Sequence, residues 1–119
     1  MTKQDQDSFN NDLLAFLDAS PTPFHAVLSM TKMLGNAGFS ELSEADEWVL
    51  KAGDKHFVTR NGSSIIAFVV GHDDLGNNGI RLVGAHTDSP CLMVKPQPDI
   101  SKQGYFQLGV EVYGGALLN

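Results

Sequence analysis

The chain has 119 residues, about the length of one domain by the usual prior of roughly 150 residues per domain. With 42% hydrophobic and 18% charged residues, its composition is near the globular average, which excludes extensive disorder and a disulfide-stabilised miniprotein. Eight basic and fourteen acidic residues give a net charge of -6. Nucleic acid is therefore not expected as a partner, because phosphate-binding surfaces are basic.

Neither a membrane span nor a signal peptide is expected. The longest apolar run, Ile65 to Val70, is far shorter than the roughly 20 residues that cross a bilayer. We therefore expect a cytoplasmic protein that does not bind membranes. The single cysteine, Cys91, cannot form an internal disulfide, and it is interpreted as a buried structural thiol. Any metal must therefore be bound by nitrogen and oxygen ligands.

Two helices are predicted near the start of the chain. The first, at about residues 8–18, rests on apolar residues at helical spacing, namely Phe9, Leu13, Phe16 and Leu17. The second is predicted at about residues 23–36, where Thr22 can act as the N-cap and Pro23 suits the first helical position. Gly38 is expected to end this helix in the left-handed conformation.

A loop and a hairpin are predicted next. Residues 40–54 have no periodicity, and Trp48 is expected to hold this loop against the core. Asn61-Gly62 separates the strand-like segments 55–60 and 63–70, and this dipeptide favours the two positive φ angles of a type I′ turn.

Three more strands are predicted. Residues 80–85 form a short apolar strand that ends at His86, and residues 91–95 form a second one that two prolines close. Residues 105–113 alternate apolar and other side chains, which indicates a half-buried strand. Because the chain ends directly after this strand with two leucines near its terminus, we interpret it as a piece of a longer protein.

His86 is the strongest candidate for chemistry. Ligand-binding residues of open α/β sheets gather at the carboxyl ends of strands, and His86 follows such an end. A neutral imidazole is a good zinc ligand, and Asp88 could accept its other N–H and so fix the tautomer. A catalytic zinc needs about three protein ligands, so this pattern alone cannot complete a site.

The other candidates have simpler interpretations. His25 is expected to pack under the proline turn, and His56 is expected to be a surface residue of the hairpin. His72, Asp73 and Asp74 form an exposed polar turn that could bind a cation opportunistically.

Three segments together resemble a known family. They are residues 20–27 (SPTPFHAV), residues 81–92 (RLVGAHTDSPCL) with residues 94–96 (VKP), and residues 107–117 (QLGVEVYGGAL), in this order. They resemble the signatures of the aspartyl aminopeptidases, and the resemblance extends from about Phe9 to the last residue. Met93 departs from the family pattern, in which this position is commonly basic. Three long motifs are much more specific than a His-x-Asp pattern.

The resemblance implies a cytosolic metallopeptidase that removes an N-terminal aspartate or glutamate from peptides with two zinc ions and an activated water. It implies a homo-oligomer, usually a dodecamer. It also implies that His86 binds zinc and that Asp88 orients it, while the remaining ligands and the general base lie beyond residue 119. The chain on its own is therefore expected to be inactive.

The fold class that the resemblance implies is α/β. Residues 1–95 would be the N-terminal part of a zinc-aminopeptidase catalytic domain, with two helices covering a mixed sheet that contains the hairpin and the 80–85 strand. Residues 96–119 would begin an inserted, β-rich domain that forms the oligomer.

Two alternatives remain open from the residues. One is a non-enzymatic module that binds a peptide or a partner protein through unpaired strand edges. The other is a small metal-binding protein that uses His72, Asp73, Asp74 and His86.

Overall fold

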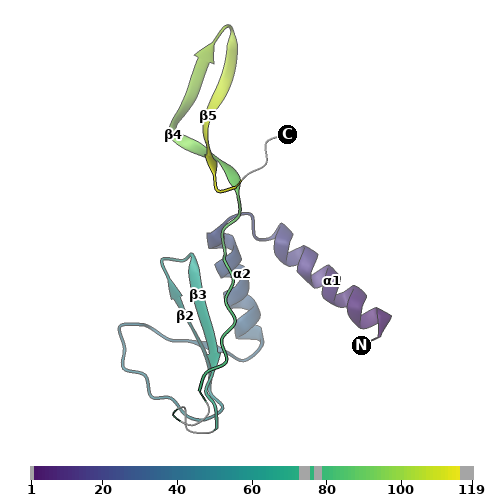
Figure 1. Cartoon of the computed structure of the whole chain (residues 1–119), viewed down its shortest axis with the longest axis vertical. Helices are drawn as coiled ribbons and strands as arrows, with labels where there is room; N and C mark the ends of the chain where they lie inside the picture. The colour runs from purple at the N-terminus through teal and green to yellow at the C-terminus, as the bar shows by residue number, and fades with distance from the viewer. Residues whose placement is uncertain (1, 73–75, 77–78, 116–119) are drawn as a thin grey trace. The chain divides into compact units, whose positions relative to one another are not determined.

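Two compact units, Met1–Thr87 and Asp88–Asn119, make up the chain in the computed structural model, which describes residues 2–72, 76 and 79–115 (Figure 1). The first unit contains two helices and a three-stranded mixed sheet, and the second contains a two-stranded antiparallel hairpin. The predicted α/β class, with two helices and a mixed sheet, is confirmed. Among the described residues, no helix is both long enough and apolar enough to cross a membrane.

Helix α1 spans Lys3–Asp18, so it begins five residues before the predicted start at residue 8. A capping box explains the difference. The Thr2 hydroxyl accepts from the backbone N–H of Asp5 at 3.2 Å, and the Asp5 carboxylate accepts from the N–H of Thr2 at 2.7 Å. These hydrogen bonds lower the pKa of Asp5. The first turn is polar, so hydrophobic periodicity could not reveal it.

Helix α2 spans Pro23–Asn36, as predicted. The Thr22 side chain caps its N-terminus by accepting from the backbone N–H of His25. At its C-terminus Gly38 has φ +83°, and the N–H of Phe39 donates to the carbonyl of Leu34 at 3.0 Å. This is a Schellman motif, and the predicted glycine cap is confirmed.

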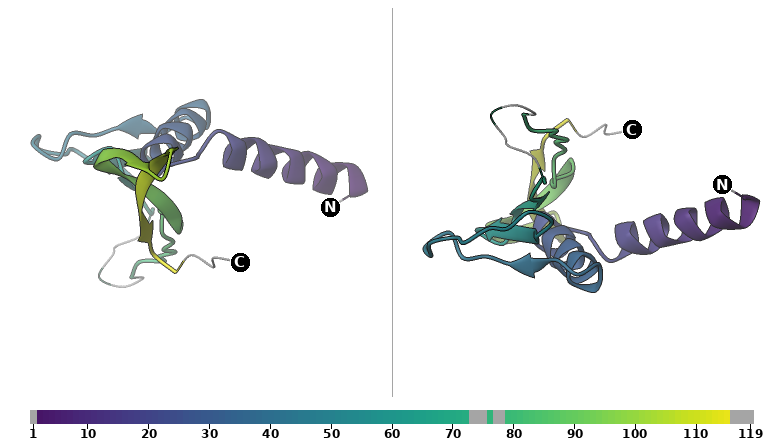
Figure 2. Two further views of the ribbon diagram at one scale, coloured as in Figure 1. Left: turned by 90° about the horizontal axis from the view of Figure 1, so that it is seen from above. Right: turned by 90° about the horizontal axis from the view of Figure 1, so that it is seen from below.

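Helix α2 lies against the sheet, whereas α1 adjoins α2 and leads away from it (Figure 2). The expectation that both helices cover the sheet is therefore wrong for α1. Among the described residues the buried apolar side chains are few, two from α2 and two from the middle strand of the sheet: Ala26, Val27, Phe57 and Val58.

The sheet has the order β1-β2-β3. β2 (Lys55–Arg60) and β3 (Ser64–Val69) form the predicted antiparallel hairpin, and Asn61 and Gly62 have φ of +54° and +63°. Ser63 lies in the turn, so β3 begins one residue later than predicted. β1 (Ser40–Glu41) pairs in parallel with β2, although its residues were predicted to be loop. Two residues are too short to give a sequence signal.

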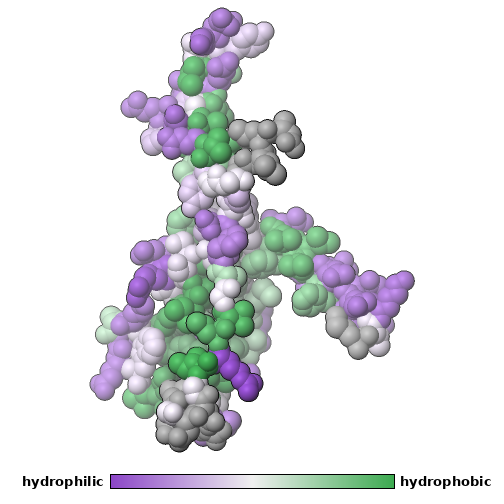
Figure 3. Space-filling view, viewed as in Figure 1, coloured by the Kyte–Doolittle hydropathy of each residue, from purple (hydrophilic) through white to green (hydrophobic). Residues whose placement is uncertain are grey.

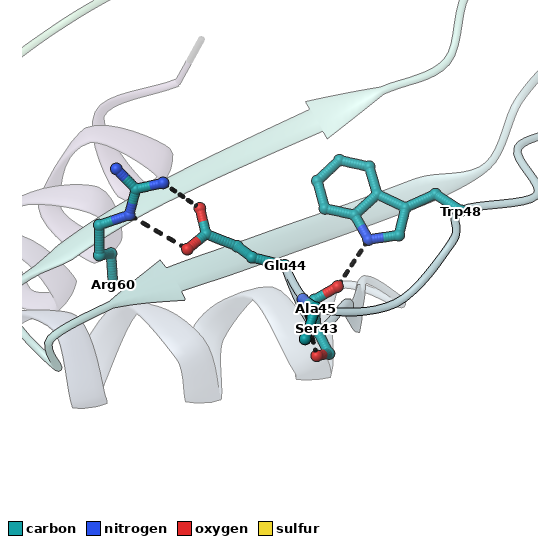
Figure 4. Close-up of polar contacts among 5 residues, drawn as sticks. All are labelled: Ser43, Glu44, Ala45, Trp48 and Arg60. Atoms are coloured by element: carbon teal, nitrogen blue, oxygen red, sulfur yellow. Dashed lines mark hydrogen bonds and ion pairs between the residues drawn. The ribbon is translucent and has the colours of Figure 1, made fainter.

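The loop between β1 and β2 is held by side chains at two points (Figure 4). The Trp48 ring stacks on Phe68 of β3 at 6.0 Å between centroids, and its Nε1 donates to the carbonyl of Ser43 at 2.7 Å. Trp48 therefore fastens the loop to the sheet, as predicted, but through the half-buried Phe68 rather than through the buried core. Glu44 accepts two hydrogen bonds from Arg60, at 2.7 and 3.1 Å, and this pairing lowers the pKa of Glu44.

The second unit is the hairpin of β4 (Cys91–Lys102) and β5 (Tyr105–Tyr113). The prediction that prolines close β4 at residue 95 is wrong. The register shifts between Val94 and Asp99, so residues 95–98 stand opposite Gly109 alone and the prolines lie in this bulge. A bulge leaves backbone groups outside the ladder, which is where a strand tolerates a residue without an N–H.

One face of this hairpin is apolar and exposed. Directly paired residues share a face, so Leu92 and Val94 lie beside Val112 and Val110. All four are exposed, as is Phe106 at 93% of its surface. The expectation that β5 is half-buried is therefore wrong in this chain, because nothing in the described part of the second unit covers the face. Figure 3 shows apolar surface on this hairpin and on the half of α1 nearer α2.

The bulge leaves little room for a side chain at Gly109. A Cβ at Gly109 would lie 3.3 Å from Cδ1 of Ile100 and 3.4 Å from the carbonyl oxygen of Pro98. We expect Gly109→Val to destabilise the hairpin by about 1–3 kcal/mol through overpacking, which thermal unfolding of the complete protein would show. Gly115→Ala is the control, because a Cβ there meets nothing within 4 Å. Equal unfolding temperatures for the two variants would contradict the expectation.

Candidate metal centre

The segment that leads to His86 is not a regular strand, contrary to the prediction for residues 80–85. Its apolar side chains are exposed, with Val83 at 96% and Leu82 at 84%. A groove of about 840 Å³ is lined by residues of β3 and by residues 79–82. The segment thus runs near the open edge of β3 without pairing with it. The physical reason is that apolar β-branched residues favour a strand only where a neighbour provides hydrogen bonds and burial.

His86 lies at the end of this segment and is exposed, so its ring is not buried in aliphatic packing. The next residue, Thr87, is hydrogen-bonded to the turn of the β2–β3 hairpin. The Thr87 hydroxyl is half-buried and donates to the carbonyl oxygen of Ser63 at 2.8 Å. This hydrogen bond anchors the backbone directly after His86 to the end of the β2–β3 hairpin.

Asp88 begins the second unit and is half-buried. The hydroxyl of Tyr113 donates to Oδ2 of Asp88 at 3.0 Å. This hydrogen bond, together with the negative charge of the carboxylate, raises the pKa of Tyr113. Tyr113 therefore keeps its proton at neutral pH and remains a donor. Sequence reasoning assigned no role to Tyr113, although it ends a predicted strand and lies in the third segment that resembles the family.

Pro90 and Gly114 lie close together at the end of the β4–β5 hairpin where Asp88 and Tyr113 meet. A Cβ at Gly114 would lie 3.4 Å from Cα of Pro90, and Gly114 has φ +71°, which favours glycine. Cys91 and Tyr113 pair directly where the strands begin and end. Asp88 thus lies on a short loop whose following residues are packed against the end of β5.

The structure changes three interpretations of other residues. Cys91 is exposed rather than buried. His25 is also exposed, and its Nδ1 lies 2.8 Å from the Thr22 hydroxyl, so the ring supports the helix cap and does not pack under the turn. His56 is half-buried rather than a surface residue, and its Nδ1 lies 2.9 Å from the hydroxyl of Ser40.

A complete metal site is not present among the described residues, which contain no group of three or more histidine, cysteine, aspartate or glutamate side chains able to hold an ion. The exposed imidazole of His86 is the type of nitrogen donor that zinc takes. His86 therefore fits the role of one nitrogen ligand of a zinc ion, and a complete site would need further ligands. Asp73 and Asp74 of the alternative cation site lie outside the described residues.

Comparison with known families decides the classification. The family model described as aminopeptidase I zinc metalloprotease (M18) matches residues 16–119, a span that includes His86, Asp88 and Tyr113. The chain belongs to the M18 family of aminopeptidases. The resemblance to this class of peptidase is thereby confirmed.

Individual M18 proteins support this classification. The probable M18 family aminopeptidase 2 of Pseudomonas savastanoi pv. phaseolicola is 59% identical over 109 residues, which is 92% of this chain and 25% of that protein. The solved structure of Chaetomium thermophilum mApe1 matches with a TM-score of 0.84 and 43% identity over 93% of this chain and 26% of that one. The S. cerevisiae mApe1 dodecamer matches with a TM-score of 0.83 and 27% identity, over 96% and 27% of the two chains. The chain thus spans about a quarter of the length of its M18 relatives.

Proposed function

We propose that this chain is the N-terminal quarter of a zinc-dependent aminopeptidase that removes N-terminal aspartate or glutamate from peptides. Membership of the M18 zinc metalloprotease family carries the proposal. The acidic specificity rests on the three motifs that resemble the aspartyl aminopeptidases. The same resemblance supports two zinc ions for each complete subunit.

In this proposal His86 is a zinc ligand and Asp88 orients it. The support is an exposed imidazole followed by a backbone anchored through Thr87, and a carboxylate that already holds a hydrogen bond from Tyr113. A carboxylate that accepts the second N–H of a ligating imidazole fixes its tautomer and raises its basicity. Zinc, when bound, would lower the pKa of its water to about 7 and polarise the scissile carbonyl.

The isolated chain is proposed to be inactive, because His86 alone cannot hold a catalytic zinc that needs about three protein ligands. The proposed division is residues 1–95 for the catalytic domain and residues 96–119 for the start of the inserted domain. The complete protein is proposed to form a homo-oligomer in the cytoplasm. A related yeast structure described as a dodecamer supports this assembly.

The test is a substrate panel on the complete gene product. Aminoacyl p-nitroanilides of aspartate, glutamate, leucine and lysine are compared, with dipeptides of the same N-terminal residues as natural substrates. We expect kcat/KM for the acidic residues to exceed that for leucine and lysine by at least about a hundredfold, equivalent to about 2.7 kcal/mol. Dialysis against a chelator should abolish turnover, and added zinc should restore it.

The outcomes separate the alternatives. A preference for leucine or lysine would reject the acidic specificity but keep an aminopeptidase. Turnover that survives complete metal removal would reject the zinc mechanism. A protein with no hydrolytic activity on any member of the panel would favour the binding module with unpaired strand edges.

A further inference from the structure

We propose that Tyr113 is a positioning residue of the metal centre, which holds the Asp88 carboxylate in place by the hydrogen bond from its hydroxyl to Oδ2. The inference rests on the proposed roles of His86 and Asp88 and extends the site to a residue that lies 25 positions beyond Asp88 in sequence. It starts from the 3.0 Å contact between the Tyr113 hydroxyl and the Asp88 carboxylate.

The donor is held by the hairpin. Tyr113 is the last residue of β5, and its backbone pairs with Cys91, the first residue of β4. Pro90 lies against Gly114 on the adjoining residues. Because the strand ladder fixes its backbone and its ring has two side-chain torsions, Tyr113 loses little conformational entropy when it donates.

The acceptor, the Asp88 carboxylate, can be held in one orientation by a hydrogen bond from the Tyr113 hydroxyl. A carboxylate has two oxygens and accepts several hydrogen bonds, so accepting from Tyr113 at Oδ2 is compatible with accepting an imidazole N–H as well. Hydrogen bonds to an ionised acceptor are stronger than neutral ones. Tyr113 would therefore restrict the rotation of the Asp88 side chain, and through it the orientation of the His86 ring.

A purely structural role is the competing explanation. In that case the hydrogen bond would only fasten the loop before β4 to the end of β5, and its loss would affect stability without affecting zinc. The two explanations differ in whether the effect of Tyr113 passes through the carboxylate of Asp88. A double-mutant cycle measures this dependence.

The experiment uses the complete protein and measures the zinc dissociation constant by competition with a chromophoric chelator. We expect Tyr113→Phe to weaken zinc binding about tenfold, the lower end of the range for groups that orient metal ligands. In an Asp88→Ala background the same change should alter zinc affinity by less than about twofold, because no acceptor for the Tyr113 hydroxyl remains on this side chain. Tyr105→Phe is the matched control on the same strand, and it should leave affinity unchanged since Tyr105 is exposed at the other end of β5.

A variant that restores the hydrogen-bond donor at position 113 distinguishes loss of the donor from a general effect on folding. Replacing Tyr113 with 4-aminophenylalanine retains an N–H donor at the same place and should return zinc affinity toward that of the parent protein. The thermal unfolding of the zinc-free variants reports any structural effect separately.

Three results would overturn the inference: unchanged zinc affinity in Tyr113→Phe, an equal loss with and without the Asp88 carboxylate, or no rescue by the amino analogue. If the parent protein binds zinc through His86 and one of these results is found, only the role of Tyr113 is rejected. If the parent protein binds no zinc through His86, the proposed function is rejected and the role of Tyr113 with it.

Discussion

Replacing His86 with alanine in the complete protein should lower kcat/KM by at least about a thousandfold. Metal ions contribute several kcal/mol of transition-state stabilisation, and each 1.36 kcal/mol is a factor of ten in rate. The effect is expected to be this large because His86 is the one residue of this chain proposed to bind the metal directly. Bound zinc, measured by elemental analysis after gel filtration, should fall together with activity.

His25→Ala is the matched control for this experiment. His25 is also an exposed histidine, and its ring contacts the Thr22 hydroxyl at the start of α2. This variant should keep its zinc and most of its turnover, with a small loss of stability from the weakened cap. Normal zinc content and normal turnover in His86→Ala would show that the ligand assignment is wrong.

The 119-residue chain expressed alone should self-associate rather than remain a monomer. Few apolar side chains are buried among its described residues, while the apolar face of the β4–β5 hairpin is exposed. The outer edge of β3 has no partner strand in the described part of the sheet. Exposed apolar patches and unpaired edges promote association, so sedimentation velocity should show species larger than a monomer whose proportion rises with concentration.

A control variant tests the cause of this association. Phe106→Lys and Val112→Lys together place two charges on the apolar face of the hairpin, and they should shift the distribution toward the monomer. A strictly monomeric parent chain with one cooperative thermal transition would contradict the account of exposed apolar surface.

The sequence predicted the elements whose signals are local. Thr22 and Pro23 determine the start of α2 and Gly38 determines its end, and the ends observed are those predicted. Asn61-Gly62 likewise fixed the β2–β3 turn. The start of α1 was missed because its capping box uses Asp5, in a polar stretch without periodicity.

Features that depend on distant residues were not predictable in the same way. Residues 80–85 have the composition of a strand but do not form one here, since a strand needs a partner for its backbone groups. The continuation of β4 through Pro96 and Pro98 depends on Gly109 leaving room for the bulge. Composition and periodicity do not show whether residues 80–85 have a partner strand, or that Gly109 stands opposite the two prolines.

The candidate site shows the same limit. His86 and Asp88 could be proposed from their place after an apolar segment, because imidazole and carboxylate chemistry is visible in the residue types. Tyr113 could not, because its contact with Asp88 depends on the pairing register of two strands that the sequence did not define. The described residues contain no group of three or more possible metal ligands, so the proposed zinc site needs ligands from elsewhere in the complete protein.

Anomalous scattering at the zinc absorption edge from crystals of the complete protein tests the central claim most directly. The account predicts an anomalous peak about 2.0–2.1 Å from a ring nitrogen of His86, with Asp88 within hydrogen-bond distance of the other ring nitrogen. A zinc peak elsewhere in the protein, with His86 outside its coordination sphere, would contradict it.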